Sequence, residues 1–233
     1  MQQMRLFSDC VCYQEEVRDP SRIAEVLNRV ILKAFRGSAP AQINVPRDFW
    51  TQVIDIDLPQ VVRIEHPSGD AAAIAKAAEL LSKAKFPVIL NGAGVILSGG
   101  IEASAKLAEA LSAPVCCNYQ HNDAFPGNHP LFCGPLGYNG SKAGMKMISQ
   151  ADVVLALGTR LNPFSSLPAY QTEYWPANAK LIQVDINADR IGLTKRVDVG
   201  IQGDAKKVAE ALLAGLSDNA GEAGRAAREA TIA

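Results

Sequence analysis

Short apolar segments without polar alternation recur along the second half of this chain. Two of them read Pro-Val-Ile-Leu-Asn over residues 87–91 and Asp-Val-Val-Leu-Ala-Leu over residues 152–157. Strands of this kind are buried on both faces, as in parallel sheets. Segments with apolar residues at helical spacing lie between them, and such alternation predicts helices on both sides of a parallel sheet. We therefore expect an α/β fold, a doubly wound parallel sheet flanked by helices.

This sheet domain is expected to fill residues 69–216. Strands are expected at 87–91, 114–118, 152–157, 180–186 and 197–201, and helices at 70–84, 101–111, 141–149 and 204–216. Residues 217–233 are rich in Ala, Gly and Glu, and we expect a linker, or a tail with a frayed helix, in this stretch.

Residues 1–57 have a different pattern. Apolar residues recur at helical spacing over residues 23–34, Gly37 is a plausible helix stop, and residues 41–45 have the composition of a strand. One helix and one strand cannot bury their apolar faces alone. We expect this segment to be the C-terminal remnant of another α/β domain, joined to the sheet domain by a linker at 58–68.

Composition excludes several classes of function. The 233 residues contain 23 Lys and Arg against 24 Asp and Glu, so the net charge of -1 favours neither nucleic acid nor an anionic membrane as a partner. No apolar run approaches the roughly 18 residues of a membrane span. Five cysteines, an odd number without zinc-site spacing, indicate a reduced compartment. We expect a cytoplasmic protein without a metal site of its own.

The carboxyl ends of the expected strands carry the candidate site. Ligands of doubly wound sheets bind there, glycines let a phosphate approach backbone N–H groups, Arg160 could pair with a phosphate, and Asp185 could accept hydrogen bonds from a ribose. The alternative is that these are only tight strand-to-helix turns. The candidate ligand-binding residues are Gly92, Gly94, Gly158, Thr159, Arg160, Asp185, Ile186, Gly203 and Asp204.

Two common nucleotide motifs are absent. Gly92-x-Gly94 is followed by Leu97 where an NAD fingerprint has its third glycine, and no acidic residue lies about 20 residues further on. The stretch from Gly134 to Lys142 lacks the Gly-Lys-Ser/Thr ending of a P-loop. The glycines therefore do not by themselves identify the ligand.

The sequence offers no convincing catalytic residue. His121 and Asp123 share a long loop and could act as a general base, but a loop histidine that bonds its own backbone is the favoured interpretation. Cys116 and Cys117 lie in an apolar strand and are expected to be packing residues.

Taken together, these segments resemble the central domain of thiamine diphosphate-dependent enzymes, the group of acetolactate synthase, pyruvate oxidase and oxalyl-CoA decarboxylase. Residues 42–48, Gln-Ile-Asn-Val-Pro-Arg-Asp, resemble the end of the pyrimidine-binding domain that precedes it. The central-domain likeness is carried by residues 87–94, 125–131, 151–152, 158–160, 184–186 and 203–205.

Longer matched loops resemble one branch of this family, the sulfoacetaldehyde acetyltransferases. They cover residues 12–20, 118–123, 136–142, 158–164 and 189–195. The resemblance implies that the full-length protein converts sulfoacetaldehyde and phosphate to acetyl phosphate and sulfite, with thiamine diphosphate as electron sink. The alternative is a non-catalytic module of an acetolactate synthase-like enzyme, which either binds a nucleotide (ADP, FAD or CoA) or acts as a spacer.

The family holds thiamine diphosphate and Mg²⁺ with a Gly-Asp-Gly motif followed by Asn-Asn, whereas this chain has Gly203-Asp204-Ala205 and no Asn-Asn. The glutamate that activates the cofactor is expected upstream of this chain, so Glu15 and Glu16 do not take that role. We therefore expect an inactive piece that does not bind the cofactor alone. Its partners would be the missing pyrimidine- and diphosphate-binding domains, in a homo-oligomer when full length.

Overall fold

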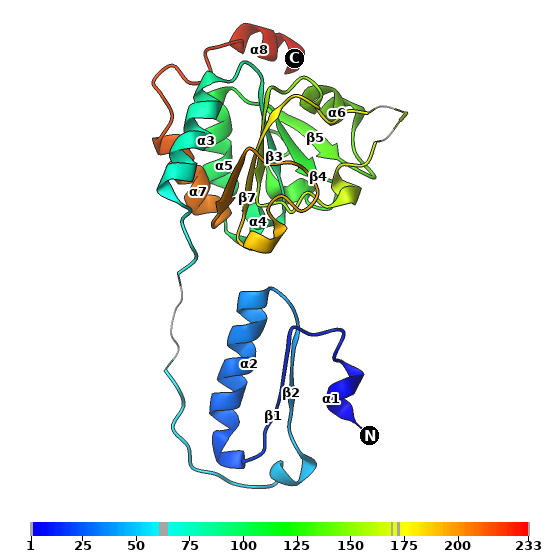
Figure 1. Cartoon of the computed structure of the whole chain (residues 1–233), viewed down its shortest axis with the longest axis vertical. Coiled ribbons are helices and arrows are strands. Elements are labelled where there is room, and N and C mark those ends of the chain that lie inside the picture. The colour runs from blue at the N-terminus through cyan, green and yellow to red at the C-terminus, as the bar shows by residue number, and fades with distance from the viewer. Residues whose placement is uncertain (1, 61–64, 169, 172, 233) are drawn as a thin grey trace. The chain divides into compact units, whose positions relative to one another are not determined.

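A computed structural model describes residues 2–60, 65–168, 170–171 and 173–232 of the chain. The chain divides into two compact units, residues 1–64 and residues 65–233 (Figure 1). Residues 61–64, inside the expected linker at 58–68, lie outside the described residues. Each unit is described by itself.

The larger unit contains a six-stranded sheet whose strands are all parallel, in the order β5-β4-β3-β6-β7-β8. This confirms the expected parallel sheet. The strands are β3 (Pro87–Asn91), β4 (Val115–Asn118), β5 (Phe132–Leu136), β6 (Val153–Leu157), β7 (Lys180–Asp185) and β8 (Val199–Gln202).

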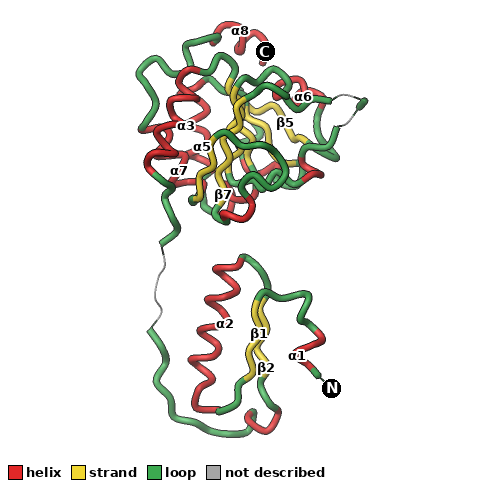
Figure 2. The backbone as a smooth tube through the Cα atoms, viewed as in Figure 1, coloured by secondary structure: helices red, strands yellow, loops and turns green. Residues whose placement is uncertain are grey.

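Helices cover both faces of this sheet (Figure 2). On one face α7 (Ala205–Ala214) packs against both α3 (Ala71–Lys83) and α5 (Ile101–Leu111), and the three helices enclose a core that includes Ile89. On the other face α6 (Lys142–Ile148) helps to enclose a second core that includes Val88 and Leu90. Neighbouring residues of β3 thus serve opposite cores, which explains why the strand is apolar throughout.

The expected and observed elements of this sheet domain agree within two residues at each end. Side chains fix several boundaries, because the carboxylate of Asp70 accepts from the Ala73 amide and the Ser141 hydroxyl accepts from the Gly144 amide. Two elements were not expected, β5 and the five-residue helix α4 (Ala93–Leu97). Gly134 and Pro135 lie inside β5 and made this stretch resemble a loop.

Strand β5 is an edge of the sheet, and two carbonyls on its outer side are already hydrogen-bonded. The Leu136 carbonyl accepts from the Tyr119 amide on the β4 side, so the backbone groups of Pro135 face the other way. Ser141 donates there through its amide to the Pro135 carbonyl at 2.7 Å and through its hydroxyl to the Cys133 carbonyl at 3.2 Å. Pro135 has no N–H group to offer.

The smaller unit is a parallel pair of strands covered by one long helix (Figure 1). The strands are β1 (Tyr13–Glu16) and β2 (Ala41–Asn44), the long helix is α2 (Ile23–Gly37), and α1 (Gln3–Leu6) precedes them. Val17, Val26 and Val30 form its small core, whereas Phe35 is 80% exposed. The unit therefore has one strand more than we expected. We did not expect β1 because its polar sequence shows no strand pattern.

Gly37 does not end α2 in the way we expected. Ser38 adopts the left-handed conformation that follows the helix, with φ of 46°, and its amide bonds back to the Phe35 carbonyl. A Cβ atom on Gly37 would lie 3.2 Å from the Cys12 sulfur. The glycine therefore makes room for Cys12.

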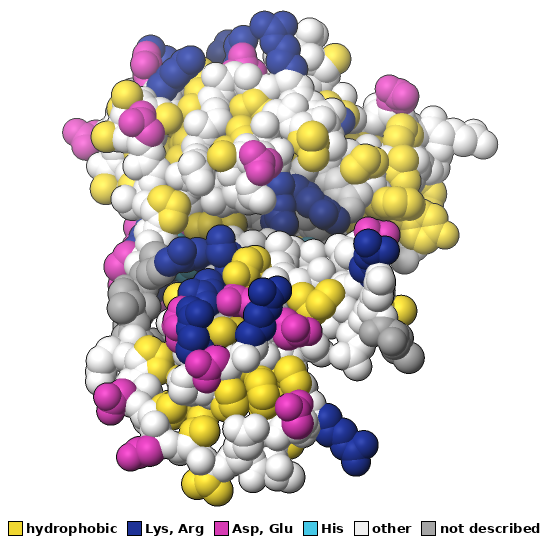
Figure 3. All heavy atoms as spheres, turned by 60° about the horizontal axis from the view of Figure 1, so that its bottom comes forward, with side chains coloured by type: hydrophobic (Ala, Val, Ile, Leu, Met, Phe, Trp, Pro, Cys, Tyr) yellow, Lys and Arg dark blue, Asp and Glu magenta, His cyan; other side chains and the backbone are white. Residues whose placement is uncertain are grey.

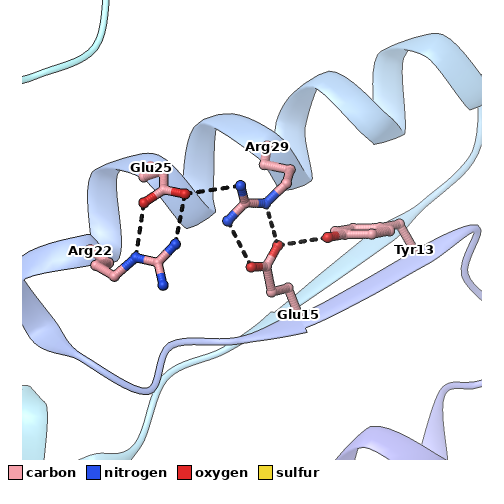
Figure 4. Close-up of polar contacts among 5 residues, drawn as sticks. All are labelled: Tyr13, Glu15, Arg22, Glu25 and Arg29. Atoms are coloured by element: carbon pink, nitrogen blue, oxygen red, sulfur yellow. Dashed lines mark hydrogen bonds and ion pairs between the residues drawn. The ribbon is translucent and has the colours of Figure 1, made fainter.

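A chain of ion pairs joins α2 to β1 (Figure 4). Arg29 donates two hydrogen bonds to Glu15, at 2.8 and 2.9 Å, and one to Glu25 at 3.0 Å. Arg22 also donates to Glu25, and the Tyr13 hydroxyl donates to Glu15 at 2.7 Å. The two guanidinium groups lower the pKa of Glu25 to about 2. Glu15 is thus held as a carboxylate, with its pKa lowered by Arg29 and Tyr13.

Short 3-10 turns occur at Pro20–Arg22, Arg47–Phe49, Asn122–Ala124, Pro163–Ser165 and Ala188–Arg190, and the last helix is α8 (Arg225–Ile232).

Charged side chains of both signs are interspersed on the face in Figure 3, in agreement with the net charge of -1. Among the described residues, no helix has both the length and the apolar character needed to cross a membrane.

Candidate crevice at the carboxyl ends of the strands

The strand order creates a reversal between β3 and β6. From β3 the chain continues outward to β4 and β5, and from β6 it continues in the opposite direction to β7 and β8. The crossover connections therefore lead away from the β3–β6 pair in opposite directions. Doubly wound sheets bind ligands at such a reversal, outside the carboxyl ends of the strands. Gly92 follows β3 and Gly158 follows β6, so the candidate glycines lie at the reversal.

The three glycines at the reversal lie so close to one another's backbones that none of them has room for a side chain. The Gly94 amide donates to the Gly158 carbonyl at 2.9 Å. A Cβ atom on Gly92 would lie 2.6 Å from the Gly158 carbonyl oxygen, and one on Gly94 would lie 2.6 Å from the Gly158 Cα. Gly158 also has φ of +62°. The turns that follow β3 and β6 approach each other here to a distance that only glycine allows, so these glycines have a structural reason that is independent of any ligand.

Thr159 is buried beside these turns and its hydroxyl oxygen has two donors. It accepts from the Asn118 side-chain amide at 2.9 Å and from the Leu161 backbone amide at 3.1 Å. The Oδ1 atom of Asn118 is buried and has no hydrogen-bond partner among the described residues. Asn118 was not among the sequence candidates. It ends β4 just as the buried Asn91 ends β3, and this repeated asparagine was the signal that could have identified it.

Asp185 ends β7, and its carboxylate accepts from the Asn187 amide at 2.9 Å. Burial raises the pKa of Asp185 above its usual value, while the nearby Arg190 and Arg160 guanidinium groups act in the opposite direction. Arg160 is exposed, and Arg190 is a further cation that the sequence analysis missed. The next residue, Ile186, is half-buried and its carbonyl accepts from the Gln202 side chain at 3.4 Å. One carboxylate and two guanidinium groups thus lie near the ends of β6 and β7.

Gly203 and Asp204 connect β8 to α7. The Gly203 amide donates to the Asp185 carbonyl at 3.0 Å, which ties this turn to the end of β7. The Asp204 carboxylate caps α7 by accepting from the amides of Lys206 and Lys207 at 3.0 and 3.1 Å. Both residues therefore have local structural roles at the carboxyl edge of the sheet.

The other sequence candidates do not form a catalytic group. No side-chain hydrogen bond joins His121 to Asp123 in the part of the chain that the structure describes. Cys116 and Cys117 are buried in β4, and burial raises the pKa of the Cys117 thiol to about 12. These thiols stay protonated near neutral pH and pack as apolar groups, as expected.

The described residues do not fit thiamine diphosphate with its cation. No group of three or more His, Cys, Asp or Glu side chains among them could hold a metal ion. The Asp204 carboxylate already accepts hydrogen bonds from two amides of α7. No step of a thiamine reaction is therefore assigned to these residues.

The family model for the central domain of thiamine pyrophosphate enzymes (pyrophosphate being another name for the diphosphate) matches residues 74–212, more than half of the chain. The chain belongs to this family. The resemblance that we inferred from the sequence is thus confirmed.

Several curated proteins are similar to this chain over most of its length. The chain is 72% identical over all of its 233 residues to a sulfoacetaldehyde acetyltransferase of Roseovarius nubinhibens, of which it covers 39%. It is 70% identical over 99% of its length to a probable sulfoacetaldehyde acetyltransferase of Rhizobium meliloti. A probable acetolactate synthase large subunit of Methanocaldococcus jannaschii is 35% identical over 91% of the chain and is covered to 36%. The chain thus spans about 39% of the length of the first two relatives.

Solved structures support the fold. The benzoylformate decarboxylase of Polynucleobacter necessarius matches 93% of this chain with a TM-score of 0.75, at 21% sequence identity and over 43% of its own length. A putative thiamin diphosphate-dependent enzyme of Mycobacterium smegmatis matches 94% of the chain with a TM-score of 0.74, at 23% identity and over 42% of its own length. These likenesses confirm the architecture of this chain.

Proposed function

We propose that this chain is part of a thiamine diphosphate-dependent acetyltransferase that converts sulfoacetaldehyde and phosphate to acetyl phosphate and sulfite. The observation that carries the proposal is the 72% identity to the Roseovarius enzyme, which extends over both units of the chain. The identity to a probable acetolactate synthase subunit is only 35%. The sulfoacetaldehyde branch is therefore favoured over an acetolactate synthase-like module.

An exchange experiment tests this proposal. The matching segment of the Roseovarius enzyme is replaced by the 233 residues of this chain, and sulfite and acetyl phosphate are both measured with sulfoacetaldehyde as substrate. We expect both products in equal amounts. The matched control exchanges the corresponding segment of the Methanocaldococcus protein, for which we expect much less product. A folded exchange protein with thiamine diphosphate bound but without either product would contradict the proposal.

In this proposal, thiamine diphosphate and Mg²⁺ are held by the pyrimidine- and diphosphate-binding domains of the full-length enzyme rather than by the residues described here. The absence of a suitable donor set among them supports this division. The chain alone is then inactive, and calorimetry with thiamine diphosphate and Mg²⁺ gives no binding heat. Turnover by the isolated chain would contradict it. We also propose that the full-length protein is a homo-oligomer in the cytoplasm. Analytical ultracentrifugation of the active exchange protein tests the oligomer, and fractionation of cells that produce the full-length protein tests the location.

A second proposal concerns the crevice itself, which we propose as a site for a nucleotide such as ADP, FAD or CoA. Three observations favour it: the strand reversal, the unpartnered Asn118 oxygen, and the Arg160 and Arg190 charges near Asp185. Calorimetry with each nucleotide tests it, with Arg160→Ala as the variant expected to weaken binding by about tenfold. If none of the three nucleotides binds the parent chain, the crevice is a structural junction and the sheet domain serves as a spacer.

A further inference from the structure

Arg228 is a buried cation at the C-terminal end of the chain that the proposed reaction does not use. It lies on α8 and is 0% exposed. A guanidinium group has five N–H donors, and each of them meets a backbone carbonyl here. Nε donates to Ser112 at 3.2 Å, one terminal nitrogen donates to Lys85 at 2.5 Å and to Ala223, and the other donates to Leu111 at 2.9 Å and to Gly221.

The five acceptors belong to two different parts of the unit. Lys85 precedes β3, and Leu111 and Ser112 end α5, so these three carbonyls belong to the body of the sheet domain. Gly221 and Ala223 belong to the C-terminal segment itself. The cation also lies at the C-terminal end of α5, where the helix dipole favours positive charge. One side chain thus hydrogen-bonds the C-terminal segment to the rest of the sheet domain, at the end of the sheet opposite the candidate crevice.

The backbone of the segment is shaped for this approach. Gly221 and Gly224 have φ of +77° and +71°. A Cβ atom on Gly221 would lie 2.7 Å from the Ala110 carbonyl oxygen, and one on Gly224 would lie 2.5 Å from the Lys85 carbonyl oxygen. Both positions therefore bring the chain close to the body in a conformation that favours glycine.

Apolar packing contributes little to holding α8. Arg228 is its only buried residue among those described, and its neighbours Ala226, Ala227 and Glu229 are exposed. A helix of eight residues is not stable in water without tertiary contacts. The docking of α8 therefore depends on the guanidinium group far more than on buried apolar surface.

We propose that Arg228 is a latch that docks residues 217–232 on the sheet domain as one cooperative segment. When the guanidinium group is removed, the segment leaves the body as a whole while the sheet stays folded. This assigns 217–232 to the sheet domain, where the sequence alone suggested a linker or a frayed tail.

Docking of α8 also completes a pocket of about 560 Å³. Its body side includes Glu109, Ser112 and His129, and its α8 side consists of Glu229 and Ile232. The His129 ring is held by two hydrogen bonds, between Nε2 and the Glu109 carboxylate at 3.1 Å and from the Leu131 amide to Nδ1 at 3.2 Å, and by an edge-to-face contact with Phe125. Release of the segment removes one wall of this pocket, so His129 reports on the latch.

Hydrogen exchange of the 233-residue chain tests the latch. In Arg228→Ala we expect the amides of residues 217–232 to lose protection by about 100-fold, because five carbonyls lose their donor and the local opening becomes easier. The amides of β3 and β6 should stay within about threefold of the parent chain. Arg228→Lys should restore little, since an ammonium group has three donors and cannot span five acceptors.

The matched control is Arg225→Ala on the same helix. It removes a guanidinium group that is 38% exposed, that pairs with Glu222 and whose buried Nε atom has no hydrogen-bond partner among the described residues, and it should leave residues 217–232 protected. As a second measurement, the ring ¹⁵N shifts of His129 should change in Arg228→Ala and not in the control. Unchanged protection in Arg228→Ala would overturn the proposal, because other contacts would then hold α8. An equal loss of protection throughout the sheet would also overturn it, because Arg228 would then belong to the global core.

Discussion

The Gly94 amide donates a hydrogen bond to the Gly158 carbonyl oxygen at 2.9 Å, and neither residue has room for a side chain. These residues are far apart in the sequence, and they join the two halves of the sheet where the strand order reverses. Any ligand of the crevice would bind beside this junction. A side chain at either position would therefore disturb both the packing of the two turns and the surface next to the candidate site.

Gly158→Ala is expected to destabilise the protein by about 2–4 kcal/mol, because it combines a left-handed backbone with a close approach to Gly94. Gly99→Ala is the matched control. Gly99 has nearly the same φ, +65° against +62°, but a Cβ atom there would meet no atom within 4 Å. We expect a cost of about 1 kcal/mol for it, measured by urea unfolding. Equal costs would mean that the close approach relaxes freely.

Asp204→Ala should destabilise the larger unit by about 1 kcal/mol, because the first-turn amides of α7 lose their acceptor. Asp204→Asn keeps an oxygen at this position and should cost at most a few tenths of a kcal/mol. Chemical denaturation of both variants checks the assignment. A large loss in the Asn variant would show that the charge of Asp204, and not its capping oxygen, is what the protein needs.

Asp185→Asn should raise Tm at pH 7 and have no such effect near pH 4. Burial raises the pKa of Asp185 in the folded protein above the ordinary value of 3.8. The stability linked to its bound proton is then fully present below pH 3.8 and is lost as pH rises through the folded-state pKa. The Asn oxygen still accepts from the Asn187 amide. Thermal unfolding of both proteins from pH 4 to pH 7 measures the difference, and a gap independent of pH would refute the raised pKa.

Arg29→Gln should raise the pKa of Glu25 from about 2 toward 4.5, though not fully, because Arg22 remains. The pKa of Glu15 should rise as well. Because both pKa values are lowered in the folded state, the stabilisation is present above pH 4.5 and is lost as pH falls through the folded-state values. Carboxyl NMR titration measures the shifts. Glu79, paired with Lys83 in the other unit, is the internal control and should not change.

Much of the sheet domain could be predicted because its boundaries carry local chemistry. β3 and α5 were predicted with their observed bounds, since Gly92 and Ser112 interrupt the apolar pattern directly after Asn91 and Leu111. β1 was missed because Tyr-Gln-Glu-Glu has no strand pattern and is stabilised by Arg29 of α2, the helix that packs on it.

The site was harder to predict than the fold. The sequence shows that Gly94 and Gly158 are glycines, but only the tertiary structure shows that their backbones cross. Arg228 could not have been identified in advance, because its partners are backbone carbonyls, which every residue possesses. Pairings of this kind leave no pattern in side-chain chemistry.

The outer side of β5 has a consequence for self-association. An open strand edge offers alternating donors and acceptors to a neighbouring chain and can start edge-to-edge aggregation. Here the Cys133 and Pro135 carbonyls are both taken by Ser141, and Pro135 lacks a donor. The outer side of β5 therefore has both of these carbonyls bonded within the chain, which makes this margin a poor template for strand addition by a second molecule.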